Sequence, residues 1–175
     1  MDSTPSSPQT DLFMDALSVL MSWRRIGKFS ARARYRIGTE RAATKTVQLT
    51  ADPMRLTYAL SSEEGGLREE CDGYNHTLTK NGRTEALPVE SLVYEAHAAR
   101  LAFPLALPIW GRSSDDYRLT GVAREVPDGF DLHLVHSAEA RLRGTLTVSV
   151  PRRMAVRLDT PTLFVAYEDV QWSDA

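Results

Sequence analysis

The sequence from Leu142 to Trp172 alternates apolar and polar side chains over three consecutive segments, and this pattern restricts the possible folds most strongly. The alternation covers residues 142–150, 154–159 and 163–170, which are separated by short turns that contain proline. Successive side chains of a strand point to opposite faces, so the pattern predicts three strands with one apolar and one polar face. The short turns favour antiparallel pairing. Such a sheet must cover its apolar face with other elements.

Similar alternation predicts further strands earlier in the chain. The clearest is Phe29–Ile37, in which phenylalanine, alanine, tyrosine and isoleucine alternate with serine and arginine. Asn81-Gly82 is typical of a tight hairpin turn between two of the others. In the third strand, Met54, Leu56, Tyr58 and Leu60 are expected on one face. The remaining predicted strands cover residues 44–51, 67–72, 74–80, 83–87, 117–126 and 130–134, which gives about ten strands in all.

Two segments have apolar residues at helical spacing. The first runs from Asp11, a suitable N-cap, to about Trp23 and is followed by Gly27. The second runs from Val89 to Ala102, directly after a proline that suits a first helical position. The chain is therefore predicted to be mainly β, of the α+β class, with two helices that cover the apolar face of an antiparallel sheet.

Length and composition are those of one globular domain. The chain has 175 residues, of which 42% are apolar and 25% charged, and its net charge is −2. We expect a single domain over residues 11–173 after a tail, residues 1–10, whose composition is typical of disorder. No apolar run is long enough for a transmembrane segment. No export signal is recognisable, so we expect a cytoplasmic protein if the sequence is complete, and a periplasmic or cell-envelope protein if a signal was removed.

The segment from Phe103 to Trp110 is apolar but contains two prolines, Pro104 and Pro108. Because proline lacks a backbone donor, the segment cannot be a helix or a central strand. It is either a lid or docking loop, or a buried plug, because an exposed apolar patch of this size needs a partner. The residues of a lid or docking loop would be Phe103, Leu105, Leu107, Ile109 and Trp110.

Six basic residues lie between positions 24 and 36, in a stretch that contains no acid. Three of them, Arg32, Arg34 and Arg36, share the polar face of one predicted strand. They can form a solvated face that pairs with acids on neighbouring strands, or contact anionic head groups. A nucleic-acid partner is not expected, because few aromatic residues lie between the arginines.

Residues with catalytic or metal-binding potential are few. His133 and His136 fall on opposite faces of one strand, and no spacing of cysteine and histidine matches a zinc site. Cys71 and His76 form a conceivable nucleophile pair, but nothing else in the sequence supports it. We therefore expect no catalytic residue, no metal and no cofactor.

The predicted order is a helix, strands, an inserted helix, and strands that end in a meander. This order resembles the outer-membrane lipoprotein carrier family, with its LolA-like and LppX-like fold, over residues 12–172. The local features that carry the resemblance are Asp52-Pro53 followed by Leu56, the turn Cys71-Asp-Gly-Tyr74, and the closing strands at Leu158-Asp-Thr160 and Phe164–Val170. The family fold is a curved, incomplete β-barrel, or half-barrel, whose concave apolar face is capped by helices around a cavity for acyl chains.

The resemblance implies a non-enzymatic carrier of the cell envelope that binds a lipid, an acyl chain or a lipidated protein. An ordinary packed core would place the same side chains inside, so a cavity is an expectation of the resemblance. The expected cavity residues are Phe29, Tyr35, Leu56, Tyr58, Val148, Val156, Val165 and Tyr167.

Two other functions fit the same pattern. An enzyme could use the cavity for a hydrophobic small molecule, with Tyr35, Tyr58, Tyr167 and His136 as the ionisable candidates. A protein–protein adaptor could use the arginine strand or the segment from Phe103 to Trp110.

Overall fold

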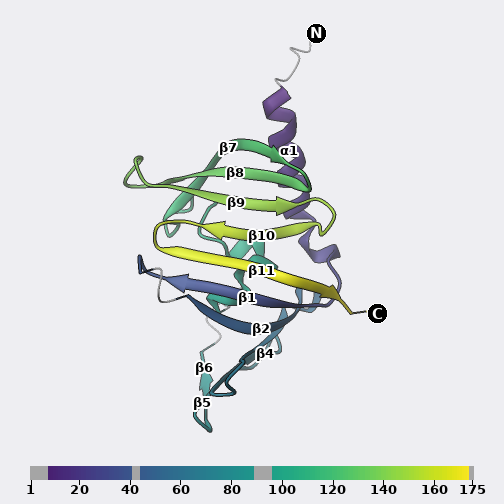
Figure 1. Cartoon of the computed structure of the whole chain (residues 1–175), viewed down its shortest axis with the longest axis vertical. Coiled ribbons are helices and arrows are strands. Elements are labelled where there is room, and N and C mark those ends of the chain that lie inside the picture. The colour runs from purple at the N-terminus through teal and green to yellow at the C-terminus, as the bar shows by residue number, and fades with distance from the viewer. Residues whose placement is uncertain (1–7, 41–43, 89–95, 174–175) are drawn as a thin grey trace.

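The chain folds into one open antiparallel sheet with a helix and several 3₁₀ turns on one side (Figure 1). The computed structural model describes residues 8–40, 44–88 and 96–173. In the first half of the sequence the elements are α1 (Pro8–Met21), η1 (Trp23–Arg25), β1 (Phe29–Ile37), β2 (Lys45–Asp52), η3 (Pro53–Arg55), β3 (Thr57–Ser62), β4 (Leu67–Cys71), β5 (His76–Lys80) and β6 (Arg83–Leu87). The others are η4 (His97–Ala102), η5 (Pro104–Ala106), β7 (Tyr117–Val126), β8 (Gly129–His136), β9 (Arg143–Ser149), β10 (Met154–Asp159) and β11 (Leu163–Trp172). The predicted class, mainly antiparallel β, is confirmed.

Two meanders make up the sheet, and they join at its centre. The strand order is β6-β5-β4-β3-β2-β1-β11-β10-β9-β8-β7, so the first strand pairs with the last. The two edges of the sheet are therefore β6 and β7, which follow one another in the sequence. The connection between them must travel from one edge to the other. The described part of it, residues 96–116, passes along the inner face, where η4 contacts β1, β2, β3, β10 and β11.

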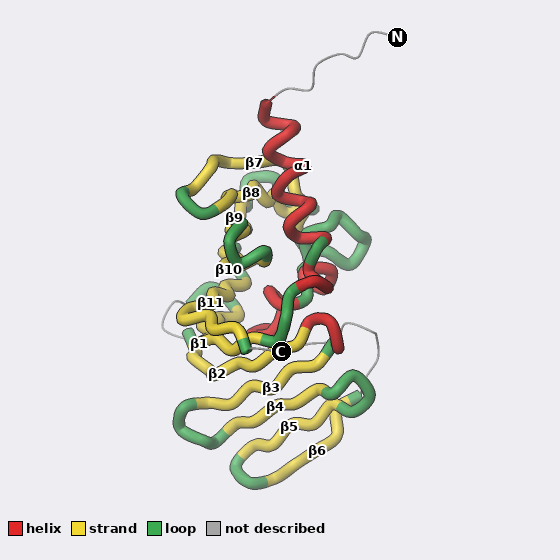
Figure 2. Tube along the Cα trace, turned by 90° about the vertical axis from the view of Figure 1, so that its right-hand side faces the viewer, coloured by secondary structure: helices red, strands yellow, loops and turns green. Residues whose placement is uncertain are grey.

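The inner face of the curved sheet is covered by α1 and by η4 (Figure 2). The helix α1 contacts β7, β8, β9 and β10, and presents Ala16 and Leu20, both fully buried, at a spacing of four residues. On β1, Ala31 and Ala33 leave little bulk above the sheet. The buried alanines of η4 can therefore approach the central strands closely. The outer face carries the polar side chains of the central strands.

The boundaries of both predicted helices differ from the observed ones. The helix α1 begins at Pro8, three positions before Asp11, so residues 8–10 of the expected tail are helical. In the second predicted helix, residues 89–95 lie outside the described residues, and His97–Ala102 is a 3₁₀ helix. It ends with the amide of Phe103 donating to the carbonyl of Arg100 at 3.0 Å. Proline at position 104 cannot supply the next donor, so the helical pattern stops there.

The third predicted strand starts later than expected. Pro53–Arg55 forms a 3₁₀ turn, because the carboxylate of Asp52 accepts the amide of Arg55 at 3.2 Å and caps it. Met54 is consequently 63% exposed, and Leu56 has a positive φ of 57° at the end of the turn. Leu56 is half-buried against the core but lies outside β3. The prediction that Met54 and Leu56 continue the face of the strand was wrong.

A β-bulge in β10 changes the predicted face of Val156. The register between β9 and β10 shifts between Ala155 and Arg157, so Val156 is the extra residue. Ala155 takes its place on the inner face and is fully buried, whereas Val156 is half-buried. The prediction that Met154, Val156 and Leu158 all point to the inner face was therefore wrong for Val156.

No helix in the described ranges combines the length and the apolar character that crossing a membrane requires.

Candidate functional site

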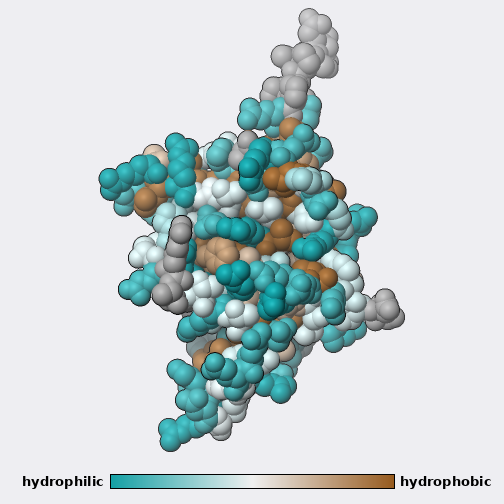
Figure 3. Space-filling view, viewed as in Figure 1, coloured by the Kyte–Doolittle hydropathy of each residue, from teal (hydrophilic) through white to brown (hydrophobic). Residues whose placement is uncertain are grey.

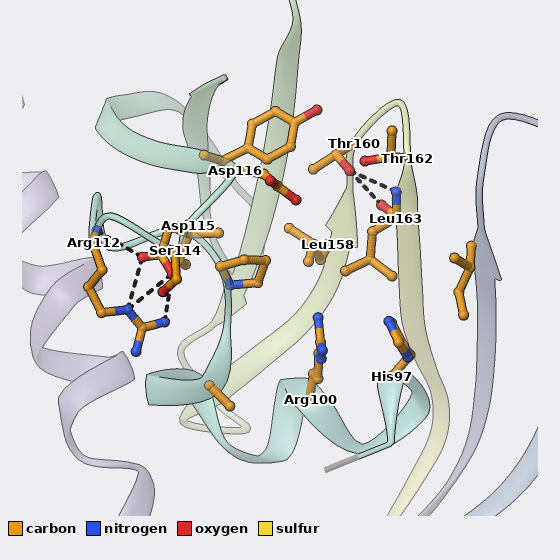
Figure 4. Close-up of a pocket in the computed structure, with 15 residues that line it drawn as sticks. His97, Arg100, Arg112, Ser114, Asp115, Asp116, Leu158, Thr160, Thr162 and Leu163 are labelled. Atoms are coloured by element: carbon orange, nitrogen blue, oxygen red, sulfur yellow. Dashed lines mark hydrogen bonds and ion pairs between the residues drawn. The ribbon is translucent and has the colours of Figure 1, made fainter. Parts of the chain in front are cut away.

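A pocket of about 450 Å³ opens where the β6–β7 connection meets the turn between β10 and β11 (Figure 4). One wall comes from η4, η5 and the residues that lead into β7, and the other from the end of β10 and the start of β11. Its volume lies within the range of about 300–1,000 Å³ that is usual for small-molecule sites. The pocket therefore has the size of a ligand site.

The apolar part of the pocket comes from both walls. Leu158 and Leu163 belong to the sheet, and Ile109 and Pro108 belong to the connection. Leu158 and Ile109 are fully buried, so these side chains form a fixed floor that packing holds in place. Ile37 lies at the rim and is 57% exposed, which leaves an apolar surface beside the opening. An apolar ligand could cover it.

Two basic side chains of η4, His97 and Arg100, point from the helix toward Leu158 and Leu163 (Figure 4). Burial, and then the positive charge of Arg100, lowers the pKa of His97 from 6.5 to about 4. His97 is therefore neutral at pH 7, and its ring can donate or accept a hydrogen bond. Arg100 supplies a positive charge to this side of the pocket.

The opposite side of the pocket carries oxygen atoms. The hydroxyl of Thr160 donates to the carbonyl of Leu163 and accepts its amide, both at 2.9 Å, which closes the β10–β11 turn. Tyr117 is 2% exposed, and its hydroxyl has no hydrogen-bond partner among the described residues. A buried polar atom of this kind is usually satisfied by water or by a ligand. The exposed Asp116 also lines the pocket, across from Arg100 (Figure 4).

Asp115 fixes the loop that forms the outer wall. Its carboxylate accepts the amides of Trp110 and Arg112 at 2.9 and 3.1 Å, and the guanidinium of Arg112 at 2.9–3.0 Å. The same guanidinium donates to the carbonyls of Leu105 and Leu107 at 3.0 and 2.9 Å. One ion pair thus connects residues 105, 107, 110, 112 and 115 of the loop. Asp115 and Arg112 pair with each other, and Arg100 and Asp116 also line the pocket.

The expected cavity residues lie in or against the core. Phe29, Val148 and Val165 are fully buried, and Tyr58 and Tyr167 are each 4% exposed. Tyr35, Leu56 and Val156 are half-buried and pack against this core. None of the eight lines the pocket of Figure 4, and Val148 and Val156 line a separate hollow of about 380 Å³. A ligand cavity among these residues stays a prediction.

The expected lid or docking residues are held inside the molecule. Leu107 and Ile109 are fully buried, Phe103 is 3% exposed, and Leu105 and Trp110 are half-buried. The ring of Phe103 packs edge-on against Trp23 at 6.3 Å, and the indole of Trp110 donates to the carbonyl of Pro104 at 2.8 Å. These contacts describe a buried plug. A lid or docking role of the five residues stays a prediction, which would require the plug to open.

Three ionisable side chains meet on the inner face of β3, β4 and β5. The carboxylate of Glu69 accepts the hydroxyl of Tyr58 at 2.9 Å and lies 2.7 Å from Nε2 of His76. Burial, and then the charge of Glu69, raises the pKa of Tyr58, so Tyr58 stays a neutral phenol. Cys71 is buried and pairs in register with His76, but the hydrogen bonds of His76 go to Glu69 and Tyr58. Tyr58, Glu69 and His76 thus form a buried hydrogen-bond network, which indicates a structural role.

The other candidates have structural partners too. The hydroxyl of Tyr167 accepts the amide of Ala102 at 3.2 Å. His136 accepts the amides of Ala138 and Glu139, and thereby closes the turn after β8. No group of three histidines, cysteines, aspartates or glutamates within residues 8–40, 44–88 and 96–173 could hold a metal ion.

The arginines of β1 lie on the outer, polar face, as the alternation predicts. Arg32 and Arg34 pair with Glu168 of β11 at 2.9 and 3.0 Å. These hydrogen bonds lower the pKa of Glu168. Arg36 donates to the carbonyl of Thr160 at 3.3 Å. Contact with anionic head groups stays a prediction.

Apart from Ile109, which was expected in a lid or docking loop, the sequence interpretation missed the residues that line the pocket. His97 and Arg100 were read only as positions of a helix, and Tyr117 only as the start of a strand. One local signal was present: Arg112 and Asp115 are three positions apart after an apolar segment, a spacing that suits an ion pair within a turn. The contact between η4 and the β10–β11 turn cannot be predicted from local sequence, because the two segments are far apart in the chain.

Comparisons with known proteins identify the fold but not a family. No protein-family model matches the chain, and no curated protein is significantly similar to it. Among solved structures, an uncharacterized conserved protein from Thermus thermophilus is similar with a TM-score of 0.55 and 11% identity. The similarity covers 93% of this chain and 88% of that one, and it shows a shared fold.

Two further structures are similar over most of this chain. One is a LolA superfamily protein from Nitrosomonas europaea, with a TM-score of 0.38 and 11% identity over 91% of this chain and 94% of that one. The other is MucB in the MucA/MucB complex from Pseudomonas aeruginosa, with a TM-score of 0.40 and 13% identity over 90% of this chain and 56% of that one. The expected LolA-like resemblance is confirmed as a likeness of fold, and it says nothing about a ligand.

Proposed function

We propose that this chain is a non-enzymatic binding protein of the cell envelope that holds an acyl chain, carried by a lipid or by a lipidated protein. The observation that carries the proposal is the pocket of Figure 4, which joins a fixed apolar floor to a small number of polar groups. Sites for hydrophobic ligands have this composition. The chain of the ligand would lie over Leu158, Leu163 and Ile109.

The polar groups favour a head group that can both accept and donate hydrogen bonds. Arg100 can donate to an acceptor, and Asp116 on the other side can accept from a donor. The unpartnered hydroxyl of Tyr117 can do either. An amide that joins an acyl chain to an amine offers one carbonyl and one N–H, so it matches both sides. A simple hydrocarbon would leave the buried hydroxyl of Tyr117 without a partner among the described residues.

Binding of an acylated peptide tests the proposal. The probe is a fluorescent dipeptide with an N-terminal dodecanoyl chain, and its anisotropy is measured against the same dipeptide without the chain. Only the acylated probe should bind. Ala106→Trp places an indole in the pocket and should abolish binding, whereas Ala86→Trp, on the exposed strand β6, should not. Equal binding of both dipeptides, or no effect of Ala106→Trp, would contradict the proposal.

Three measurements test the other parts of the proposal. Mass spectrometry of the probe after incubation should recover it intact, and release of free dodecanoate would favour the enzyme alternative. Organic extraction of protein purified from its native host should yield an acylated molecule. Fractionation of that host should place the protein in the envelope. Its recovery in the cytoplasm would remove the envelope role but not the binding role.

A further inference from the structure

The outer face of the sheet, on which no helix of the described residues lies, contains a second hollow. It has a volume of about 1,330 Å³ and crosses six neighbouring strands, from β1 through β11, β10, β9 and β8 to β7. Figure 3 views this face and shows hydrophilic side chains gathered across it, with apolar patches between them. We call this hollow the outer groove. It lies on the other side of the sheet from the plug and α1.

The outer groove concentrates positive charge in a chain that is slightly acidic overall. Its lining includes five arginines but only two acids, Asp131 and Asp159. Each acid is already paired, with Arg124 at 2.8 Å and Arg157 at 2.6 Å respectively. The five arginines are Arg34, Arg36, Arg124, Arg143 and Arg157. The groove thus has an excess of cations.

Two of these arginines have no carboxylate partner in the described part of the chain. Arg36 donates only to the backbone carbonyl of Thr160, at 3.3 Å. Arg143 is exposed at the start of β9 and makes no ion pair with a described residue. Both guanidinium groups can therefore bind a ligand's carboxylate without first breaking an ion pair, which lowers the free-energy cost of binding.

An aromatic ring holds two of the guanidinium groups in place. Phe164 of β11 lies between β1 and β10, and the guanidinium carbons of Arg36 and Arg157 are 5.8 and 5.2 Å from its centroid. Arginine planes that stack on an aromatic ring lose less freedom when they form hydrogen bonds. The groove therefore presents oriented donors.

The dimensions of the groove limit the kind of anion that it fits. Six strands about 4.8 Å apart span roughly 24 Å, so a single phosphate or carboxylate could reach only one or two of the arginines. A flat membrane surface cannot enter a hollow. The paired acids Asp131 and Asp159 would repel a chain with a charge on every unit, and the two rings of the lining, Phe164 and His133, offer little stacking for bases. Both points disfavour nucleic acid.

We infer that the outer groove binds an extended acidic segment of another protein. About seven extended residues span the six strands, at roughly 3.4 Å per residue. Carboxylates spaced along such a segment can meet Arg36 and Arg143 and lie away from the paired acids Asp131 and Asp159. Threonine hydroxyls between the arginines can bind the backbone of the segment. This site lies on the other face of the sheet from the acyl-chain pocket, and the two linings share only Thr160.

Fluorescence anisotropy with a labelled Glu-Ser-Glu-Ser-Glu-Ser-Glu peptide tests the inference. The unmodified protein should bind it, and binding should weaken as salt rises. Arg36→Gln combined with Arg143→Gln should weaken binding by about tenfold, because two charge-assisted contacts are lost. The control combines Arg25→Gln with Arg83→Gln, two exposed arginines outside the groove, and removes the same charge. It should leave the affinity within about twofold.

The remaining outcomes overturn the inference. Absence of binding, or equal weakening in both double variants, would show that the groove has no specific role. Tighter, variant-sensitive binding of oligothymidylate would make the groove a nucleic-acid site. Variant-sensitive binding to phosphatidylglycerol vesicles, without binding of the peptide, would make it a membrane contact. Circular dichroism of both variants confirms that the sheet is intact, and neither substitution leaves a carboxylate without its partner.

Discussion

Replacement of Asp115 by alanine should destabilise both the protein and its pocket. The side chain of Asp115 is 2% exposed, and its carboxylate accepts two backbone amides as well as the guanidinium of Arg112. Alanine leaves the amides of Trp110 and Arg112 without their acceptor. It also releases the guanidinium that holds the carbonyls of Leu105 and Leu107. The wall of the pocket would then lose its fixed conformation.

The expected magnitude follows from the exposure of each partner. A hydrogen bond to a charged acceptor contributes about 1.5–3 kcal/mol when it is shielded from water, which applies to the two amides. The side chain of Arg112 is 50% exposed, so its ion pair contributes only about 0–1 kcal/mol. Because water reaches part of the opened loop, we expect a total loss of about 3 kcal/mol. For a chain of this size, that loss lowers Tm by roughly 6–12 °C.

Urea unfolding and thermal unfolding, each followed by circular dichroism, measure the loss. Asp115→Asn keeps an acceptor oxygen and should recover about half of it. The control is Asp116→Ala, because the neighbouring aspartate is exposed and its side chain makes no hydrogen bond with a described residue. That variant should stay within about 0.5 kcal/mol of the unmodified protein. If Asp115→Ala proves as mild as Asp116→Ala, the ion pair does not organise the loop.

Three other outcomes are expected from the same structure. His97 has a pKa of about 4 when folded and about 6.5 when unfolded, so its contribution is present above pH 6.5 and is lost as pH falls toward 4. Between pH 7 and pH 5 the free energy of unfolding should fall by about 1–2 kcal/mol more than in His97→Asn, and parallel curves would contradict this. Gly144→Ala puts a methyl group 2.8 Å from the side chain of Thr160 and should cost about 1–3 kcal/mol, measured by urea unfolding; an unchanged midpoint would show that the strands can separate there. Arg32→Gln combined with Arg34→Gln removes partly exposed ion pairs and should cost about 0–1 kcal/mol, so a loss of several kcal/mol would reveal tighter pairing.

Alternation in the sequence was sufficient to predict most of the sheet. The bounds of β1 and β7 match the predicted segments. In β1 the polar and apolar residues alternate regularly, whereas the register of β7 with β8 shifts twice. The pattern failed where the backbone leaves the strand period. At Leu56 a capped 3₁₀ turn interrupts the strand, and at Val156 a bulge inserts one residue. Neither device changes the hydrophobicity pattern, so the sequence alone does not distinguish them from a regular strand.

The pocket could not be predicted in the same way. It forms where η4 and the β10–β11 turn meet, and this contact depends on the order of strands in the sheet. Whether the segment Phe103–Trp110 is buried or exposed depends on the same strand order. Because β6 and β7 are the two edges, the chain between them has to cross the inner face, and its apolar residues become part of the core. Local sequence cannot reveal which strands are edges.

The pairing of β1 with β11 has a consequence for biosynthesis. Arg32 and Glu168 are partners across this pair but lie 136 residues apart in the sequence. While the ribosome is still making the second half, β1 has one unpaired side, and its row of free amides and carbonyls is available to other chains. The two meanders can become a single sheet only after β11 has emerged. A nascent chain of this kind needs shielding until then, and loss of the last strand by proteolysis would divide the sheet at its centre rather than trim an edge.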